Sequence, residues 1–233
     1  HPRPIGYGLL LLLALALPAL GRGPGSEGDL LPIGGGSPVP DHALVVVGPG
    51  TGLGVATLVH ALGRWIPVPG EGGHVDLAPS SEREIAIWRH IERTGGRVTG
   101  ETVLSGSGLL RLARAIAATD GIPCPCTTPE EVTAGAAAGE PVAVETVQTF
   151  ARALGRLAGD FALANLARGG VFIRGGVSLK IERWLTDGTF RAAFEDKAPH
   201  GKLAAGMPTW LIKHPRAALA GLAAFASAPD RYG

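Results

Sequence analysis

The feature that most constrains the fold is a glycine-rich turn enclosed by two apolar, β-prone segments. Residues 43–47 form a β-branched run typical of a buried strand, and residues 53–59 resume that pattern after the glycines of residues 48–54. Because both flanks have a strand pattern, the glycines join two strands rather than a strand and a helix. Such a turn offers closely spaced backbone N–H groups with few side chains in the way, as a phosphate site requires.

Two common nucleotide-binding templates do not fit this turn. A Walker loop requires a Gly-Lys-Ser/Thr sequence, and the turn contains no lysine. The dinucleotide fingerprint Gly-x-Gly-x-x-Gly finds Leu53 or Val55 where its third glycine should stand. The strand-turn-strand setting instead suits the phosphate hairpins of actin-like ATPases, and a purely structural hairpin is the alternative.

The remaining pattern alternates strands with helices. Residues 30–36 suit a loop or a short edge strand, and further strands are expected at residues 171–173 and 210–212. A capping pair, Ser81 and Glu84, opens a helix that Gly95 and Gly96 should end. Other helices are expected at residues 109–118, 141–167 and 217–226, the long one with close packing at two glycines, Gly155 and Gly159. This order predicts an α/β fold with ligands on turns at strand ends.

Charge and cysteine content narrow the classes of partner. The 233 residues include 21 Lys and Arg against 20 Asp and Glu, so no charge excess draws the chain to nucleic acid or an anionic membrane. A small, roughly neutral ligand fits better. Cys124 and Cys126, the two cysteines, cannot form a disulfide framework and lack further zinc ligands at a suitable spacing. We therefore expect a reducing compartment, a loop feature at the cysteines, and no metal site.

A second glycine-rich segment, residues 70–76, carries a candidate sugar site. Glu71 is flanked by glycines, where a ligand can approach the backbone, and a carboxylate can accept hydrogen bonds from two vicinal sugar hydroxyls. His74 follows three residues later and can donate or accept on the same side of the turn. Taken singly, each of these residues, and likewise Glu101 ahead of a helix, also fits an ordinary solvated side chain.

The combination of motifs is more specific than its parts. In collinear order the sequence carries Gly-x-Gly-Thr-Gly-Leu-Gly, Gly-Glu-Gly-Gly-His-Val-Asp, Glu-x-Val-Leu-Ser-Gly-x-Gly, Gly-Gly-Val-Phe-Ile-x-Gly-Gly and Phe-Arg-Ala-Ala-Phe-Glu-Asp-Lys, at residues 48–54, 70–76, 101–108, 169–176 and 190–197. This order resembles the bacterial-type glucokinase family of ATP-dependent hexose kinases, over about residues 30–212. The resemblance implies an actin-like ATPase, or ribonuclease-H-like, fold with two domains around a cleft.

The resemblance also implies an activity and ligands. It implies transfer of a phosphoryl group from ATP, with Mg²⁺, to D-glucose, the first step of glycolysis, by a cytoplasmic protein and a possible homodimer. The implied glucose ligands are Glu71, His74 and Glu101. The implied ATP-facing residues are Gly48, Gly50, Thr51 and Gly52 at the phosphates and Gly175 and Gly176 near the adenosine. The cluster Glu195-Asp196-Lys197 matches the family too, but we assign it only a structural role.

The resemblance fails at the general base. The family carries this Asp in an Asn-Asp-Phe segment just before an apolar helix, which residues 12–20 resemble. Counting back places Gly8 and Leu9 at the Asn and Asp positions, and a leucine cannot accept a proton. No catalytic residue is therefore expected, and the chain as given should be nearly inactive. A non-catalytic sugar-binding regulator of the same fold is the alternative.

The resemblance divides the chain into three parts. Residues 1–21 would be a remnant of the interdomain helix region of an otherwise absent small domain, and residues 22–213 the large sugar- and nucleotide-binding domain. Residues 214–233 would form a C-terminal helix packing toward the small domain. The apolar run at residues 9–17, behind Arg3, also outlines a secretory signal peptide. We prefer the helix remnant because the family match resumes within this run.

Overall fold

A mixed six-stranded sheet forms the centre of the protein in a computed structural model that describes residues 29–232. The strand order is β1-β6-β5-β2-β3-β4. Strands β2, β5 and β6 are mutually parallel, whereas β1, β3 and β4 each run antiparallel to a neighbour. The bounds are β1 Leu30–Gly34, β2 Leu44–Pro49, β3 Leu53–Ala61, β4 Arg64–Val68, β5 Gly170–Ile173 and β6 Thr209–Ile212. The segment of residues 30–36 thus contains an edge strand, β1, and the glycine turn joins the antiparallel strands β2 and β3, as predicted.

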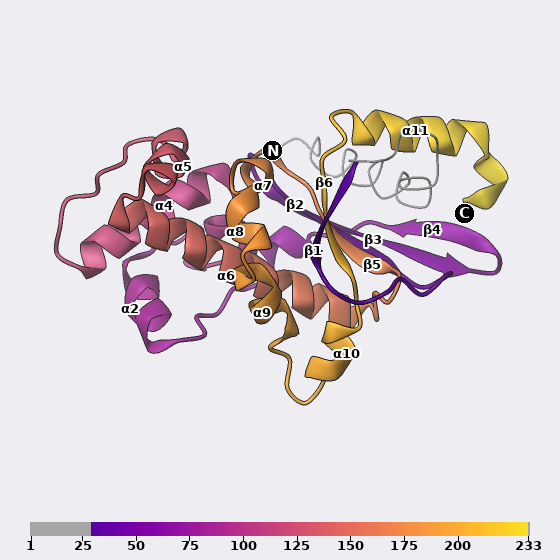
Figure 1. Ribbon diagram of the computed structural model, residues 1–233, viewed down its shortest axis with the longest axis horizontal. Coiled ribbons are helices and arrows are strands. Elements are labelled where there is room, and N and C mark those ends of the chain that lie inside the picture. The colour runs from indigo at the N-terminus through magenta and orange to yellow at the C-terminus, as the bar shows by residue number, and fades with distance from the viewer. Residues whose placement is uncertain (1–28, 233) are drawn as a thin grey trace.

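Helices cover both faces of this sheet (Figure 1). Helices α4, α6 and α9 cover one face, where their buried residues form the larger hydrophobic core. Helix α11 lies on the opposite face and contributes to a second, smaller core. The bounds are α2 Glu82–His90, α3 Gly100–Val103, α4 Gly106–Thr119, α5 Pro129–Ala138, α6 Pro141–Ala164, α7 Gly176–Lys180, α8 Glu182–Thr186, α9 Thr189–Glu195, α10 Gly201–Ala205 and α11 Ala217–Ser227, with short 3₁₀ turns η1 Gly72–His74 and η2 Pro229–Arg231. The described residues therefore form the layered α/β fold that the sequence predicts.

Strand β2 shows why its sequence is apolar without alternation. Val45 and Val47 belong to the core under α4 and α6, whereas Leu44 and Val46 belong to the second core with Tyr232. A strand buried on both faces has no solvent side on which to place polar residues. The strand consequently holds the glycine turn at its end in a fixed place.

The two glycines of α6 allow a close helix crossing. A β-carbon on Gly155 would lie 2.2 Å from the carbonyl oxygen of Phe190, and one on Gly159 would lie 2.6 Å from that of Phe194. Both phenylalanines are fully buried, and Lys197 Nζ lies 2.8 Å from the carboxylate of Asp160 on α6. The predicted close packing is confirmed, and the motif of residues 190–197 makes helix–helix contacts.

Helix α2 differs from its prediction at both ends. Ser81 caps the helix by accepting a hydrogen bond from the Glu84 N–H, but the Glu84 carboxylate accepts from the N–H and hydroxyl of Ser80 instead of closing a capping box. The helix ends at His90, before Gly95 and Gly96, because buried Ile91 adopts an extended conformation. The prediction was too long because Ile91 is apolar and buried, so the helical pattern of apolar residues extends one residue beyond the helix.

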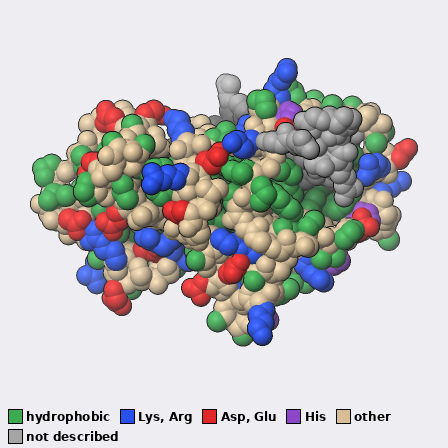
Figure 2. All heavy atoms as spheres, in the orientation of Figure 1, with side chains coloured by type: hydrophobic (Ala, Val, Ile, Leu, Met, Phe, Trp, Pro, Cys, Tyr) green, Lys and Arg blue, Asp and Glu red, His purple; other side chains and the backbone are tan. Residues whose placement is uncertain are grey.

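Several predictions lie beyond the described residues, including the interdomain helix, the signal-peptide alternative and the placement of Leu9 at the general-base position. Within residues 29–232, no helix has both the length and the apolarity to cross a membrane. On the face that Figure 2 shows, acidic and basic side chains are interspersed rather than segregated. This distribution agrees with the nearly balanced charge of the sequence.

Candidate active site

The glycine turn between β2 and β3 presents backbone donors at one edge of the fold. The Gly50 N–H donates to the Gly52 carbonyl at 2.8 Å, which tightens the turn around exposed Thr51. Within residues 29–232, the N–H groups of Thr51 and Gly52 have no backbone acceptor. Adjacent unused N–H groups at a tight turn are suited to bind an anion such as a phosphate.

The other predicted nucleotide-facing glycines lie beside this hairpin. The Arg174 N–H donates to the Val47 carbonyl at 3.0 Å, which continues the pairing of β5 with β2. At the next residue, a β-carbon on Gly175 would lie 1.9 Å from the Pro49 carbonyl oxygen, so only glycine fits this approach. The structure thus brings the start of α7, with Gly175 and Gly176, to the base of the glycine turn.

The segment of residues 70–76, called here the sugar loop, directs two polar side chains outward. The His74 N–H donates to the Glu71 carbonyl at 2.9 Å, and His74 Nε2 lies 3.7 Å from Glu71 Oε2. Both side chains are at least half exposed, whereas Gly72 and Gly73 are buried. The glycines therefore pack against the fold, whereas the side chains of Glu71 and His74 lie side by side at its surface.

Residues 97–100 form hydrogen bonds with the C-terminal part of the sugar loop and with Leu77. The Leu77 N–H donates to the Val98 carbonyl at 3.0 Å, and the Gly100 N–H donates to the Val75 carbonyl at 2.9 Å. The Arg97 guanidinium donates to the Asp76 carboxylate at 2.9 Å and to the His74 carbonyl at 3.3 Å. Sequence reasoning missed Arg97, because nothing in its local pattern signals partners more than twenty residues away.

Glu101 follows directly and contacts the glycine turn. It lies in the first turn of α3, which Thr99 caps through a capping box with Thr102. The Leu53 N–H donates to Glu101 Oε2 at 2.8 Å, across 48 positions in the sequence. Glu101 is thus partly buried and tied to the hairpin rather than simply solvated.

Leu53 is the point at which the predicted segments meet. Glu101 accepts from its N–H, and a β-carbon on Gly73 would lie 1.9 Å from its carbonyl oxygen. A β-carbon on Gly100 would lie 2.9 Å from its side chain. The structure therefore assembles the sugar loop, the start of α3 and the glycine turn around one residue of β3.

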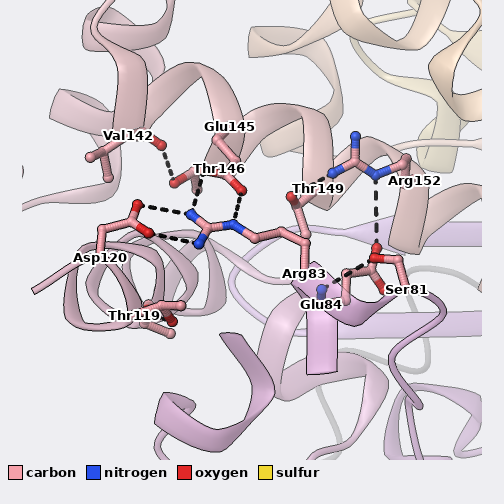
Figure 3. A network of polar contacts seen from close by, with 11 residues as sticks. Ser81, Arg83, Glu84, Thr119, Asp120, Val142, Glu145, Thr146, Thr149 and Arg152 are labelled. Atoms are coloured by element: carbon pink, nitrogen blue, oxygen red, sulfur yellow. Dashed lines mark hydrogen bonds and ion pairs between the residues drawn. The ribbon is translucent and has the colours of Figure 1, made fainter. Parts of the chain in front are cut away.

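A charge network ties α2 to the end of α4 and to α6 (Figure 3). The Arg83 guanidinium donates to Asp120 at 2.6 and 2.8 Å and to Glu145 at 2.7 and 2.9 Å. These hydrogen bonds hold the pKa of the Asp120 carboxyl below its ordinary value and raise that of Arg83. The helix that follows the sugar loop is thereby anchored at its first turn.

Buried Glu84 adds a second anchor next to the first. Its carboxylate is almost fully buried and accepts hydrogen bonds from both terminal nitrogens of Arg156, at 3.1 and 2.8 Å. Arg156 also donates to the Ala78 carbonyl at 3.3 Å, two residues beyond the sugar loop. A buried carboxylate requires such pairing, so this contact fixes the chain that leaves the loop.

Residues 29–232 contain no group of three or more His, Cys, Asp or Glu side chains arranged to hold a metal. Cys124 and Cys126 are free thiols, and the Cys124 thiol donates to the Cys126 carbonyl at 3.3 Å. Burial raises the pKa of the Cys126 thiol. The pair is a local loop contact.

A mixed sheet with a glycine turn at the ends of its inner strands β2 and β3, packed against the sugar loop and the capped helix α3, defines a domain of the actin-like ATPase fold. The family model "Glucokinase" matches residues 12–229. The chain belongs to the glucokinase family.

Known relatives support this assignment. The chain is 53% identical over 221 residues to a glucokinase of Mesorhizobium japonicum, covering 94% of this chain and 63% of that protein. It is 52% identical over 222 residues to a glucokinase of Rhizobium meliloti, covering 95% of this chain and again 63% of the relative. The chain therefore spans less than two thirds of the length of these curated relatives.

Solved structures agree on the fold. A crystal structure of glucokinase from an Antarctic psychrotroph matches with a TM-score of 0.85 and 30% identity, over 92% of this chain and 66% of the other. A glucokinase from Balamuthia mandrillaris in complex with glucose matches with a TM-score of 0.74 and 20% identity, over 94% and 63%. A ROK family glucokinase from Streptomyces griseus in complex with glucose and AMPPNP matches with a TM-score of 0.54 and 23% identity, over 78% and 60%.

Proposed function

We propose that the protein of which this chain forms a large part transfers the γ-phosphoryl group of ATP to D-glucose, giving ADP and glucose 6-phosphate. Residues 22–213 would supply the large domain, which binds both substrates. The observation that carries the proposal is the meeting at Leu53 of the sugar loop, Glu101 and the glycine turn. Phosphoryl transfer depends on the relative position of two substrates. The contacts at Leu53 fix the candidate sugar-binding and phosphate-binding segments relative to each other.

Glucose would bind to Glu71, His74 and Glu101. Carboxylates accept hydrogen bonds from sugar hydroxyls, and an imidazole can donate or accept, so the set suits a neutral polyol. The outward position of Glu71 and His74 on a loop packed from behind supports this role. The related structure that contains glucose supports the choice of sugar.

ATP would bind along the glycine turn. Gly48, Gly50, Thr51 and Gly52 would face the phosphates, and Gly175 and Gly176 would lie near the adenosine. Unused N–H groups at the turn and the absence of side chains where Gly175 meets Pro49 support this placement. Mg²⁺ would arrive with ATP and neutralise phosphate charge, and we assign it no protein ligand.

We assign no general base, because counting back from the apolar helix that resembles the family places Leu9 where the family has its Asp. We therefore propose that the chain as given binds its substrates without turnover. The exposed Leu219, Leu222 and Phe225 on α11 support a C-terminal helix that packs toward a small domain. We further place the reaction in the cytoplasm, as the first step of glycolysis, in a possible homodimer.

The test combines calorimetry with a coupled assay for glucose-dependent ADP release. The chain as given is titrated with glucose and with ATP, and a version fused to a complete family amino-terminal domain is assayed for turnover. Binding by the former and turnover by the latter are expected. Absence of any glucose effect in the restored protein would discard the proposal, whereas glucose binding without turnover there would favour a sugar-binding regulator.

A further inference from the structure

The two carboxylate oxygens of Glu101 have different surroundings. Oε2 accepts from the Leu53 N–H at 2.8 Å, at the end of the glycine turn. Within residues 29–232, Oε1 has no hydrogen-bond donor. An ionised carboxylate accepts at both oxygens, so the side chain can hold the turn with one and a ligand hydroxyl with the other.

The glycine turn rests directly on this carboxylate. A β-carbon on Gly52 would lie 2.5 Å from Glu101 Oε2, so the carboxylate occupies the space where a side chain of the turn would stand. A second tie comes from the start of α4, where the Gly106 N–H donates to the Gly50 carbonyl at 2.8 Å. Of these two hydrogen bonds, only the one at Glu101 involves a side chain, and a ligand that binds this side chain can change the strength of that hydrogen bond.

We propose that Glu101 couples the sugar and nucleotide sites by holding the phosphate-facing turn through Leu53 while it binds the sugar. This inference rests on the proposed function. A sugar hydroxyl on Oε1 and the Leu53 N–H on Oε2 require the same side-chain rotamer, so each contact stabilises the geometry that the other needs. Such coupling is reciprocal, because each ligand must raise the affinity of the other by the same factor.

The test is calorimetric titration of the whole chain with Mg-AMPPNP, with and without saturating glucose. Wild type should bind AMPPNP several-fold more tightly when glucose is present. Glu101→Ala removes a charge-assisted hydrogen bond to a backbone amide, so AMPPNP affinity without glucose should fall about tenfold. The increase with glucose should disappear.

Two further variants separate the effect of the hydrogen bond to Leu53 from the effect of the contact with the sugar. The side-chain amide of Glu101→Gln keeps an oxygen that can accept from Leu53, so this variant should retain AMPPNP affinity while glucose affinity falls. The matched control, Glu71→Gln, changes a proposed sugar ligand on the sugar loop rather than the hydrogen bond to Leu53, so only glucose affinity should fall. If Glu101→Ala does not fold, Glu101→Asp replaces it, because the shorter carboxylate cannot reach Leu53.

The outcomes distinguish this inference from the function on which it rests. Equal AMPPNP affinity in wild type and in the variant that lacks the Leu53 contact would overturn the coupling, with the proposed function intact. An equal loss of AMPPNP affinity in Glu71→Gln would also overturn it, because the effect would not depend on the tie. Failure of wild type to bind AMPPNP at all would refute the nucleotide site and the coupling with it.

Discussion

Gly73 lies directly against the carbonyl oxygen of Leu53, which a β-carbon at position 73 would approach to 1.9 Å. At this point the sugar loop and the hairpin of β2 and β3 are therefore packed backbone to backbone. A contact of this kind transmits small displacements, because a packed interior has little free volume to absorb them. The position of Glu71 and His74 relative to the turn is consequently set by this glycine.

Substitution of Gly73 tests this packing. Gly73→Ala forces the loop away from β3, and overpacking of this kind typically costs about 1–3 kcal/mol of unfolding free energy. Urea denaturation should show that loss, and calorimetry should show weaker glucose binding. Gly70→Ala is the matched control, since a β-carbon there meets nothing within 4 Å. Equal stability of the two variants would contradict the packing argument.

The proposed nucleotide site offers a similar pair of glycines. Gly175→Ala places a β-carbon 1.9 Å from the Pro49 carbonyl and should move α7 away from the hairpin. We expect reduced AMPPNP affinity together with lower thermal stability. Gly176→Ala meets nothing within 4 Å and should leave stability unchanged. A stable Gly175→Ala variant with normal AMPPNP affinity would show that the close approach is dispensable.

Much of this site follows from local sequence. The glycine turn, the sugar loop and the strands on either side carry short-range signals, since β-branched runs predict strands and glycines mark close approaches. Helix α5 also had a signal, because Thr128 caps it and Pro129 opens it, yet we did not predict it. Helix α7 and its short neighbours had none, because elements of five to seven residues are too short to show periodicity.

The contacts that make the site one unit could not be predicted in this way. Leu53 and Glu101 are 48 residues apart, and His74 and Arg97 are 23 apart. Which donor meets which acceptor depends on how β3, α3 and the sugar loop pack, and no single-segment pattern encodes that arrangement. Family resemblance predicted a sugar-binding role for Glu101, whereas its hydrogen bond to the hairpin is seen only in the structure.

Glu71 should act on the sugar alone. Glu71→Gln removes the charge that strengthens a hydrogen bond to a sugar hydroxyl, a difference typically of about 1 kcal/mol or more. Glucose affinity should fall at least about fivefold, and AMPPNP affinity should stay near that of wild type. Calorimetric titration with each ligand measures both. Equal loss of both affinities would mean that Glu71 has only a structural role.

Arg97 should matter through the loop that it holds. Arg97→Leu removes the hydrogen bonds to Asp76 and to the His74 carbonyl, so His74 loses a constraint on its position. Glucose affinity should decrease while AMPPNP affinity and stability change little, because the Arg97 side chain is more than half exposed. The control is Arg93→Leu, because within residues 29–232 the one hydrogen bond of the Arg93 guanidinium is to the Gly96 carbonyl, at 3.4 Å. Matching glucose affinities in the two variants would rule out a positioning role.

The Arg83 network predicts a specific dependence of stability on pH (Figure 3). Arg83 holds the pKa of Asp120 below its ordinary value of 3.8, so the unfolded chain binds the Asp120 proton more readily than the folded chain does. The contribution to stability is therefore fully present above that value and is lost as pH falls through the lower folded pKa. Because both side chains are partly exposed, the effect should be modest and weaker at high salt.

Arg83→Met removes this contribution and retains much of the aliphatic stem. The difference in unfolding free energy between wild type and Arg83→Met should be constant from pH 7 to about pH 5 and should shrink below pH 4. Urea denaturation at a series of pH values measures the difference, and the difference between wild type and Asp120→Asn should shrink over the same pH range. A difference that stays constant to pH 2 would mean that Arg83 acts through packing rather than through its charged hydrogen bonds to the carboxylates.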